Sequence, residues 1–203
     1  MADLIRNSDL SEQVFDAVDF ADEIWAEELI VGSEFVGCTF SGVTFASSEL
    51  RACRFVECTF VRCDLAVVRL ADSFMTGSTF EDCRLSGIDW TRGRWADHQL
   101  HGPNAFERCD LSMGVFDDLN LTDLLMTGCK VHDASFRNTR LSGANLEGSS
   151  LSGTDFTGAI LSGARLVNTS GIALDPRSCD LTGAILDLAS AMSIVWTLGV
   201  TIE

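Results

Sequence analysis

Basic residues, tyrosine and proline are scarce in this chain of 203 residues: it has 14 Lys and Arg against 30 Asp and Glu, no Tyr and two Pro. Phosphate contacts need clustered Lys and Arg, so a net charge of −16 excludes an electrostatically driven nucleic-acid binder. No apolar run approaches the roughly 18 residues of a membrane span, and residues 1–30 lack the basic-then-apolar order of a signal peptide. We therefore expect a cytoplasmic protein whose charged partner is a basic surface.

Catalytic and metal-binding patterns are also missing. None of the eight cysteines forms a CxxC motif, and the three histidines do not combine into a ligand set. The segment FDDLNLTD lacks the glycine and the closing Glu of a calcium loop. Cysteines recur 20 residues apart, as in Cys63 and Cys83, but side chains stacked in register have the wrong vectors for a disulfide. We expect no enzyme activity, no cofactor and no metal, with the thiols buried as small apolar groups.

What the chain does contain is a period of five. Every fifth residue from Ile5 to Leu100 is large and apolar, and after a slip of one residue the series resumes from Phe106 to Leu166. All 33 positions obey the rule although hydrophobic residues of every kind make up 46% of the chain, so chance is excluded. Twelve of the 13 Phe are in register, and only Phe74 is not.

The residues around each large position, called i, predict a coil. All eight cysteines lie at i−2, a position that is small over most of the chain, and 13 of the 17 glycines lie at i+2. A period of five fits neither a helix nor a simple strand, but it fits a chain that turns a corner every five residues. Glycine at i+2 suits that turn. Four sides then close a square coil of 20 residues, and the coils stack at the strand spacing with i and i−2 inside.

The segments CDLSM, ANLEG, TDFTG and CDLTG resemble the A(D/N)Lxx signature of the pentapeptide repeat family over about residues 5–186. The resemblance implies an all-β fold, a right-handed quadrilateral parallel β-helix. We expect this β-helix over residues 1–187, with an irregular N-terminal cap at 1–28 and a register slip near 101–105, where Pro103 cannot donate to a ladder. One ladder of large residues should run, across the slip, through Phe15, Phe35, Phe55, Met75, Trp95, Phe116, Phe136 and Phe156.

Residues 188–203 differ from the repeats and predict a short helix. Asp187 can cap a helix that begins near Leu188, and Gly199 is placed to end it. An apolar helix of this length needs a partner, and the open end of a β-helix is an exposed edge. The helix therefore plugs its own coil, and it either serves only as a plug or also forms a dimer contact. The residues expected at that contact are Leu188, Ala191, Met192, Val195, Trp196 and Leu198.

Acidic residues are expected to be uneven around the square. Counting outward positions with a slip of one residue gives two adjacent sides 12 acids and five bases, against 11 and eight on the other two. This excess either keeps the rod soluble or forms a working anionic face. The residues expected on that face are Asp16, Glu34, Glu57, Glu81, Asp82, Asp97, Asp117, Asp118, Asp123 and Asp155.

The C-terminal segment, with the stretch RCDLSMGVF, resembles the quinolone-resistance branch of the family, the Qnr and MfpA-like proteins. That resemblance implies a homodimeric rod that imitates duplex DNA and protects DNA gyrase, through its A subunit, or topoisomerase IV. The absence of long inserted loops favours the MfpA-like subtype. Nine coils at about 4.8 Å give about 43 Å, so an end-to-end dimer matches about 25 base pairs. The alternative is a pentapeptide repeat scaffold with an unrelated protein partner.

Overall fold

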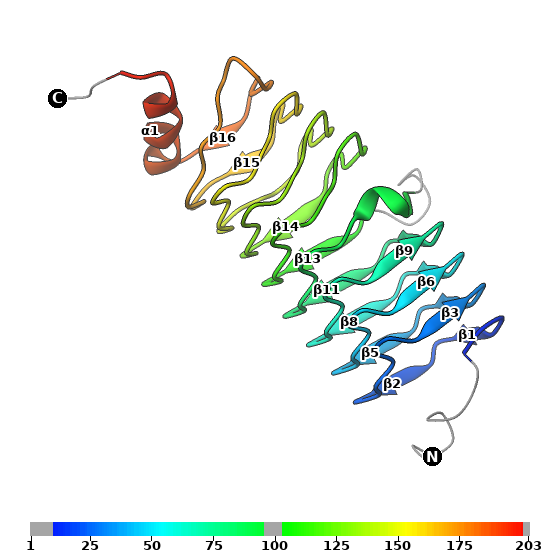
Figure 1. Ribbon diagram of the computed structural model, residues 1–203. Coiled ribbons are helices and arrows are strands. Elements are labelled where there is room, and N and C mark those ends of the chain that lie inside the picture. Colours follow the sequence, from blue (N-terminus) through cyan, green and yellow to red (C-terminus); the bar gives the residue numbers. More distant parts are fainter. Residues whose placement is uncertain (1–9, 96–102, 201–203) are drawn as a thin grey trace.

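The computed structural model describes residues 10–95 and 103–200, and it is a stack of square coils closed at one end by a helix (Figure 1). Parallel pairing keeps the ladders in register, as in Phe15 beside Phe35 and Phe20 beside Phe40. The predicted all-β quadrilateral parallel β-helix with a short C-terminal helix is confirmed. The strands are β1 (Val14–Asp16), β2 (Asp19–Ala21), β3 (Leu29–Val31), β4 (Glu34–Val36), β5 (Thr39–Ser41), β6 (Glu49–Arg51), β7 (Arg54–Val56), β8 (Thr59–Val61), β9 (Arg69–Ala71), β10 (Phe74–Thr76), β11 (Thr79–Glu81), β12 (Arg94–Trp95), β13 (Ala105–Glu107), β14 (Leu125–Thr127), β15 (Arg165–Leu166) and β16 (Ile185–Leu186). The helices are η1 (Trp90–Arg92) and α1 (Leu188–Thr197).

The core is built from the large residues at position i. Phe20, Phe40, Phe60, Phe80 and Phe106 stack ring on ring, with centroids 4.6–5.1 Å apart. Each of these rings is almost fully buried, and removing one such side chain from water contributes roughly 2 kcal/mol to folding. The period of five is therefore the repeat of a continuous aromatic and aliphatic core.

The corners of the square use the left-handed backbone region at i+2. Glycine takes many of these positions, and at Gly153 a Cβ atom would lie 2.2 Å from Oδ1 of Asp133. Val67 adopts the same conformation with φ 51°, which is unfavourable for a β-branched residue. The stacked coil hydrogen bonds on either side of the corner therefore hold even a poorly suited residue in the turn.

One coil is longer than the others, and this corrects the predicted slip of one residue. Met75 pairs with Trp95, a separation of 20, but Phe80 pairs with Phe106, a separation of 26. Six extra residues therefore lie between β12 and β13, and part of that segment, 96–102, is outside the described residues. The expectation that this chain carries only a one-residue slip was wrong. In a pattern with a period of five, an insertion of six residues shifts the large residues by one position only, so it looks like a slip of one.

The insertion also corrects the predicted ladder across it. Asp89 pairs with Val115, and the Trp90 indole stacks on the Phe116 ring with centroids 5.6 Å apart. Phe116, Phe136 and Phe156 therefore continue the ladder of Ile30, Leu50, Leu70 and Trp90. They do not continue the ladder of Phe15.

The four ladders define the four sides of the rod. Side 1 holds Phe15, Phe35, Phe55, Met75, Leu121, Leu141 and Leu161; side 2 holds Phe20, Phe40, Phe60, Phe80, Phe106, Met126, Leu146 and Leu166; side 3 holds Trp25, Phe45, Leu65, Leu85, Leu111, Val131 and Leu151; side 4 holds Ile30, Leu50, Leu70, Trp90, Phe116, Phe136 and Phe156.

The first coil is regular from residue 10 onward. Strands β1, β2 and β3 pair in register with β4, β5 and β6. Within the segment 1–28 that was expected to be an irregular cap, residues 10–28 follow the repeat, and residues 1–9 are outside the described residues. Leu10, Phe20 and Trp25 are buried, so the core already begins in this coil.

Asn104 restores the register after the insertion. In regular coils an inward hydroxyl at i−2 accepts from one backbone N–H and donates to a carbonyl, as Ser73 does with Cys53 N and Leu50 O. Asn104, which is buried, does both with its amide: Oδ1 accepts from Ser78 N at 2.9 Å and Nδ2 donates to Met75 O at 3.2 Å.

Replacing Asn104 with Ala should therefore destabilise the protein by about 1–3 kcal/mol, because a buried N–H and a buried carbonyl lose their partner. Chemical denaturation of the two proteins measures this difference. Ser152→Ala, at an exposed serine, is the control and should change stability by less than about 0.5 kcal/mol. Equal stability of Asn104→Ala and the parent chain would contradict the role assigned to Asn104.

Thiol labelling should test directly whether the cysteine side chains point into the coil. Seven of the eight are buried, Cys179 is half-buried, and burial raises the pKa of Cys58 to about 12. Because the thiolate is the reactive form, a thiol reagent should label Cys179 first and the other seven only on denaturation. Rapid labelling of several cysteines in native protein would contradict this expectation, and mass spectrometry of the labelled chain distinguishes the two results.

Candidate functional site

Most outward charges lie at i−1, i+1 and i+2 of the four sides, and at these positions each side carries more acids than bases. The acids are Asp16, Glu34, Glu57, Asp123 and Asp180 on side 1; Asp19, Asp22, Glu81, Asp82, Glu107, Glu147 and Asp187 on side 2; Glu27, Asp64, Asp110 and Asp133 on side 3; and Glu12, Glu49, Asp72, Asp89, Asp117, Asp118 and Asp155 on side 4. The bases are Arg54, Arg94 and Arg140 on side 1; Arg62, Arg108 and Arg165 on side 2; Arg84 and Lys130 on side 3; and Arg51, Arg69, Arg92 and Arg137 on side 4.

The predicted anionic residues do not lie on two sides. The insertion moves Asp117, Asp118 and Asp155 to side 4 and Asp123 to side 1, while Glu81 and Asp82 stay on side 2. The set thus forms an arc over sides 4, 1 and 2 that leaves out side 3, and Asp97 lies outside the described residues. The expected contrast between two pairs of sides was wrong, because it assumed a slip of one residue.

Ion pairs between neighbouring coils neutralise part of this arc. Arg54 contacts Glu34 at 3.3 Å, and Arg137 contacts Asp155 at 2.8 Å. Arg108 contacts Asp82 at 2.8 Å, together with Glu81 and Glu107, and its guanidinium lowers the pKa of the Asp82 carboxyl. These exposed pairs contribute little to stability, but they reduce the negative charge that a partner would meet.

Some other acids of the predicted face make no ion pair with a base among the described residues, and Asp117 and Asp118 accept hydrogen bonds instead. Asp117 accepts hydrogen bonds from the Ser135 hydroxyl at 2.5 Å and from Arg137 N at 3.0 Å, so its carboxylate also holds the stack together. Asp118 accepts from Asn138 at 3.1 Å. Asp16 and Asp123, both on side 1, make no ion pair within the described part of the chain.

Side 3 has four acids, the fewest of any side, and two of them pair with bases of the same side. Asp64 pairs with Arg84 at 2.5 Å, and Asp110 pairs with Lys130 at 3.3 Å. Along this side the charges therefore alternate in sign from coil to coil. The arc of sides 4, 1 and 2 together has 19 acids and ten bases, so most of the excess negative charge lies there.

A second asymmetry runs along the rod, and sequence reasoning missed it because charges were counted by side. Residues 12–49 contain nine acids and no base, and the first basic residue after them is Arg51. The next 45 residues, 51–95, contain seven bases and six acids. A running charge count along the sequence would have shown this concentration at the N-terminal coils.

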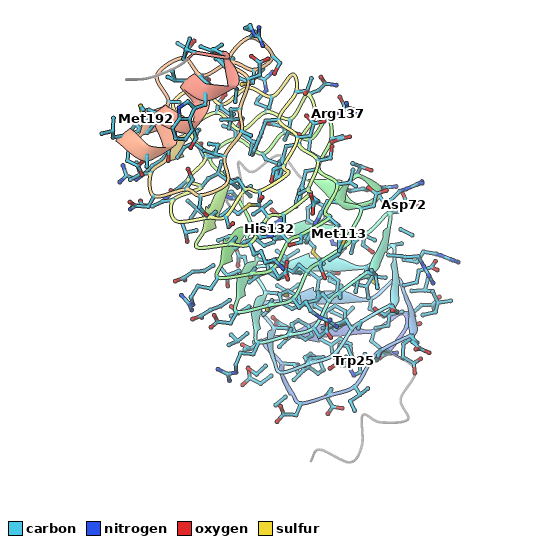
Figure 2. All side chains as sticks on the ribbon, turned by 60° about the vertical axis from the view of Figure 1, so that its left-hand side comes forward. Trp25, Asp72, Met113, His132, Arg137 and Met192 are labelled. Atoms are coloured by element: carbon cyan, nitrogen blue, oxygen red, sulfur yellow. The ribbon has the colours of Figure 1, made fainter. Side chains whose placement is uncertain are left out.

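Helix α1 closes the C-terminal end of the stack, opposite the coil that holds Trp25 (Figure 2). Asp187 caps it by accepting from Ser190 N at 2.8 Å, and this bond holds the pKa of the Asp187 carboxyl below its usual range. Ser190 and Ile194 are buried, and the Thr197 hydroxyl donates to Leu174 O at 3.0 Å. Ile194, which was not among the predicted residues, is therefore the apolar residue by which α1 packs on the coils.

The predicted dimer residues divide between two environments. Leu188 is 78% exposed and Trp196 is 59% exposed, and Leu198 is also exposed. Ala191, Met192 and Val195 are half-buried. Leu188, Met192 and Trp196 are four residues apart, so they form one apolar stripe on the side of α1 that faces away from Ile194.

Among residues 10–95 and 103–200, no three His, Cys, Asp or Glu side chains are grouped to hold a metal ion. A hollow of about 530 Å³ beside η1 is lined by Val67 and by the ion pairs of Arg69 with Glu49 and Arg92 with Asp89. None of the helices in the described part of the chain is long and apolar enough to cross a membrane.

Comparisons with known proteins agree with the fold. The pentapeptide repeat region family matches residues 33–105, and the family of pentapeptide repeats (8 copies) matches residues 134–170. No curated protein matches the chain by sequence. A trypsin-treated form of QnrB1, a plasmid-mediated fluoroquinolone resistance protein, is 22% identical over 94% of this chain and 100% of that chain, with a TM-score of 0.63.

Two further structures are more distant. Full-length QnrB1 is 22% identical over 92% of this chain and 100% of that chain, with a TM-score of 0.50. HetL, involved in heterocyst differentiation regulation in the cyanobacterium Nostoc, is 16% identical over 88% of each chain, with a TM-score of 0.42.

Proposed function

Because this chain is a pentapeptide repeat protein, we propose that it is a DNA mimic that binds a type II topoisomerase, either DNA gyrase or topoisomerase IV. Binding would modulate the enzyme and protect it from fluoroquinolones or a similar gyrase poison. The observation that carries this proposal is a straight, acid-lined rod whose fold matches QnrB1 over 94% of the chain. A cytoplasmic location follows from such a partner.

The dimensions of the rod support mimicry of a duplex. Nine successive rungs run along side 2 from Phe20 to Leu186, which gives eight spacings of about 4.8 Å, or about 38 Å. Two rods joined end to end would place about 75 Å of stacked coils in line. That length corresponds to about 22 base pairs at 3.4 Å each.

Homodimerisation through α1 completes the proposal. The stripe of Leu188, Met192 and Trp196 lies at the end of the rod, and an exposed apolar patch there is suited to an interface between copies. A two-fold axis through α1 would align the two rods and bring the same stripe of each subunit together.

The anionic arc is the proposed contact with the topoisomerase. The DNA-binding surface of such an enzyme, including the gyrase A subunit, must be basic to hold phosphates. Acids on sides 4, 1 and 2 complement it, and binding would compete with DNA. Attraction of this kind is fast and weakens with salt, because exposed charges are screened beyond about 8–10 Å at physiological ionic strength.

A supercoiling assay tests the proposal. Purified gyrase is titrated with this protein in the presence and absence of ciprofloxacin. We expect inhibition of supercoiling at high protein concentration and restored activity in the presence of the drug. If neither occurs and no binding to gyrase or topoisomerase IV is detected at low salt, the scaffold function with an unrelated partner is the surviving alternative.

A further inference from the structure

Of the coils that the structure describes, the first ends the stack with open sheet edges. In the described residues, β1, β2 and β3 are each the terminal strand of their sheet. In the second coil, the backbone N–H at i−1 donates to the coil before it, as Glu34 N donates to Gln13 O at 2.8 Å and Thr39 N to Val18 O at 3.0 Å. The corresponding N–H groups of the first coil, at Val14 and Asp19, therefore point away from the second coil and toward the end of the rod.

The side chains at this edge are unusually apolar. Val14, Ile24 and Leu29, all at i−1, are 73%, 78% and 51% exposed. In the second coil the same positions hold Glu34, Thr44 and Glu49. Apolar residues thus replace polar ones where a further coil or strand would stack, and cross-strand contacts with such residues stabilise an added strand.

The core is least covered beside β1. Phe15 is only partly buried, whereas Phe20, Trp25 and Ile30 of the same coil are buried. A strand added beside β1 would place one of its side chains on the Phe15 ring. It would also accept a hydrogen bond from Val14 N, as the first coil accepts one from Glu34 N.

The negative charge of the first coil indicates which kind of segment can bind at this edge. Residues 12–28 carry seven acids and no base, and none of these acids makes an ion pair within the described chain: Glu12, Asp16, Asp19, Asp22, Glu23, Glu27 and Glu28. A second copy would bring an equally acidic end or the α1 end, which has no basic residue between 181 and 200. A basic segment from another protein complements this end, and like charge opposes pairing of two such ends.

We propose that β1 binds a basic, extended segment of a partner protein, which adds to the sheet as a further strand at the N-terminal end of the rod. Apolar residues of that segment cover Phe15 and Val14, and its Lys or Arg residues face Asp16 and Asp19. Main-chain hydrogen bonds provide the affinity and alternate side chains the specificity, as in other cases of strand addition. This surface is at the opposite end from α1 (Figure 1), so it is separate from the proposed dimer contact, and it shares Asp16 with the proposed topoisomerase arc.

Fluorescence anisotropy with a fluorescein-labelled peptide of alternating Lys and Val, about ten residues long, tests this proposal with the full chain alone. We expect saturable binding that weakens as salt rises from about 50 mM to about 300 mM. The same peptide with N-methyl groups on alternate amides should bind at least about tenfold more weakly, because it cannot pair with β1.

Two variants locate the site. Val14→Pro removes the outward N–H without changing charge and should weaken binding at least about tenfold. Asp16→Lys with Asp19→Lys should do the same, whereas Asp118→Lys with Asp123→Lys, an equal charge change in the middle of the rod, should weaken it less than about threefold. Circular dichroism confirms that each variant is folded.

Three results would overturn the proposal. Equal affinity for the N-methylated peptide, or equal loss in the two Lys pairs, would mean attraction by bulk charge without strand addition. A wild-type particle mass that falls on Val14→Pro substitution would instead assign the edge to a second copy. Because no topoisomerase is present, these results are independent of the outcome of the supercoiling assay.

Discussion

Replacing both Leu188 and Trp196 with Asp should convert the proposed dimer into a monomer and leave the β-helix folded. Both side chains are largely exposed in the single chain, so the substitution costs the isolated subunit little. In a dimer through α1, each subunit would lose two apolar contacts worth roughly 2 kcal/mol each and gain charges at a buried contact. We expect the dimer dissociation constant to rise by more than about 1000-fold, which corresponds to about 4 kcal/mol.

Light scattering at micromolar concentration measures the effect as a halved particle mass. Met113→Asp with Leu125→Asp is the matched control, because both residues are exposed and apolar but lie on the sides of the rod away from α1. This control should remain dimeric. A parent chain that is already monomeric would remove the dimer from the proposal, and a control that also dissociates would place the contact elsewhere.

The dimer variant also bears on function. If two rods in line are needed to imitate a duplex of about 22 base pairs, the monomer should inhibit gyrase much more weakly than the dimer. A monomer with full inhibitory activity would show that one rod with its acidic arc is sufficient.

The fold could be predicted because every repeat carries the same pattern of residue types. Large residues at i, small ones at i−2 and glycine at i+2 give the inward faces and the corners without any tertiary information. Regular pairing such as Phe20 with Phe40 then follows from a separation of 20. The helix was predictable for a similar reason, because the cap at Asp187 is a local signal.

The insertion was not predictable from the period. An added segment of six residues leaves the large residues only one position out of phase, so it looks the same as a slip of one. Only the pairing of Phe80 with Phe106, and the stacking of Trp90 on Phe116, distinguishes the two. Because the long coil was assumed to have one extra residue instead of six, Asp117, Asp118 and Asp123 were assigned to the wrong sides of the rod. Charge patterns on a β-helix are therefore only as reliable as the coil count that precedes them.

The anchoring of α1 was also only partly visible in sequence. An apolar stripe was read through Leu188, Ala191, Met192, Val195 and Leu198, but the residue that packs into the coil is Ile194. A helix of ten residues that is apolar around most of its circumference has no unique inward face. Packing against Leu174 and Thr169 selects that face, and it leaves Leu188 and Trp196 outside.

Reversing charge on side 1 should weaken gyrase inhibition far more than the same reversal on side 3. Asp16→Lys with Asp123→Lys changes the charge of a dimer by +8 at the centre of the acidic arc, at positions with no ion pair in the described chain. Glu27→Lys with Asp133→Lys makes the same change on the opposite side, again with one position in the first coil and one in the middle of the rod.

We expect the concentration for half-inhibition of supercoiling to rise at least about tenfold for the side 1 pair and less than about threefold for the side 3 pair. The difference should shrink as salt is raised, because screening reduces attraction by exposed charges. Equal effects would mean that total charge rather than the arc governs binding, and a larger effect of the side 3 pair would place the topoisomerase contact on side 3, outside the arc.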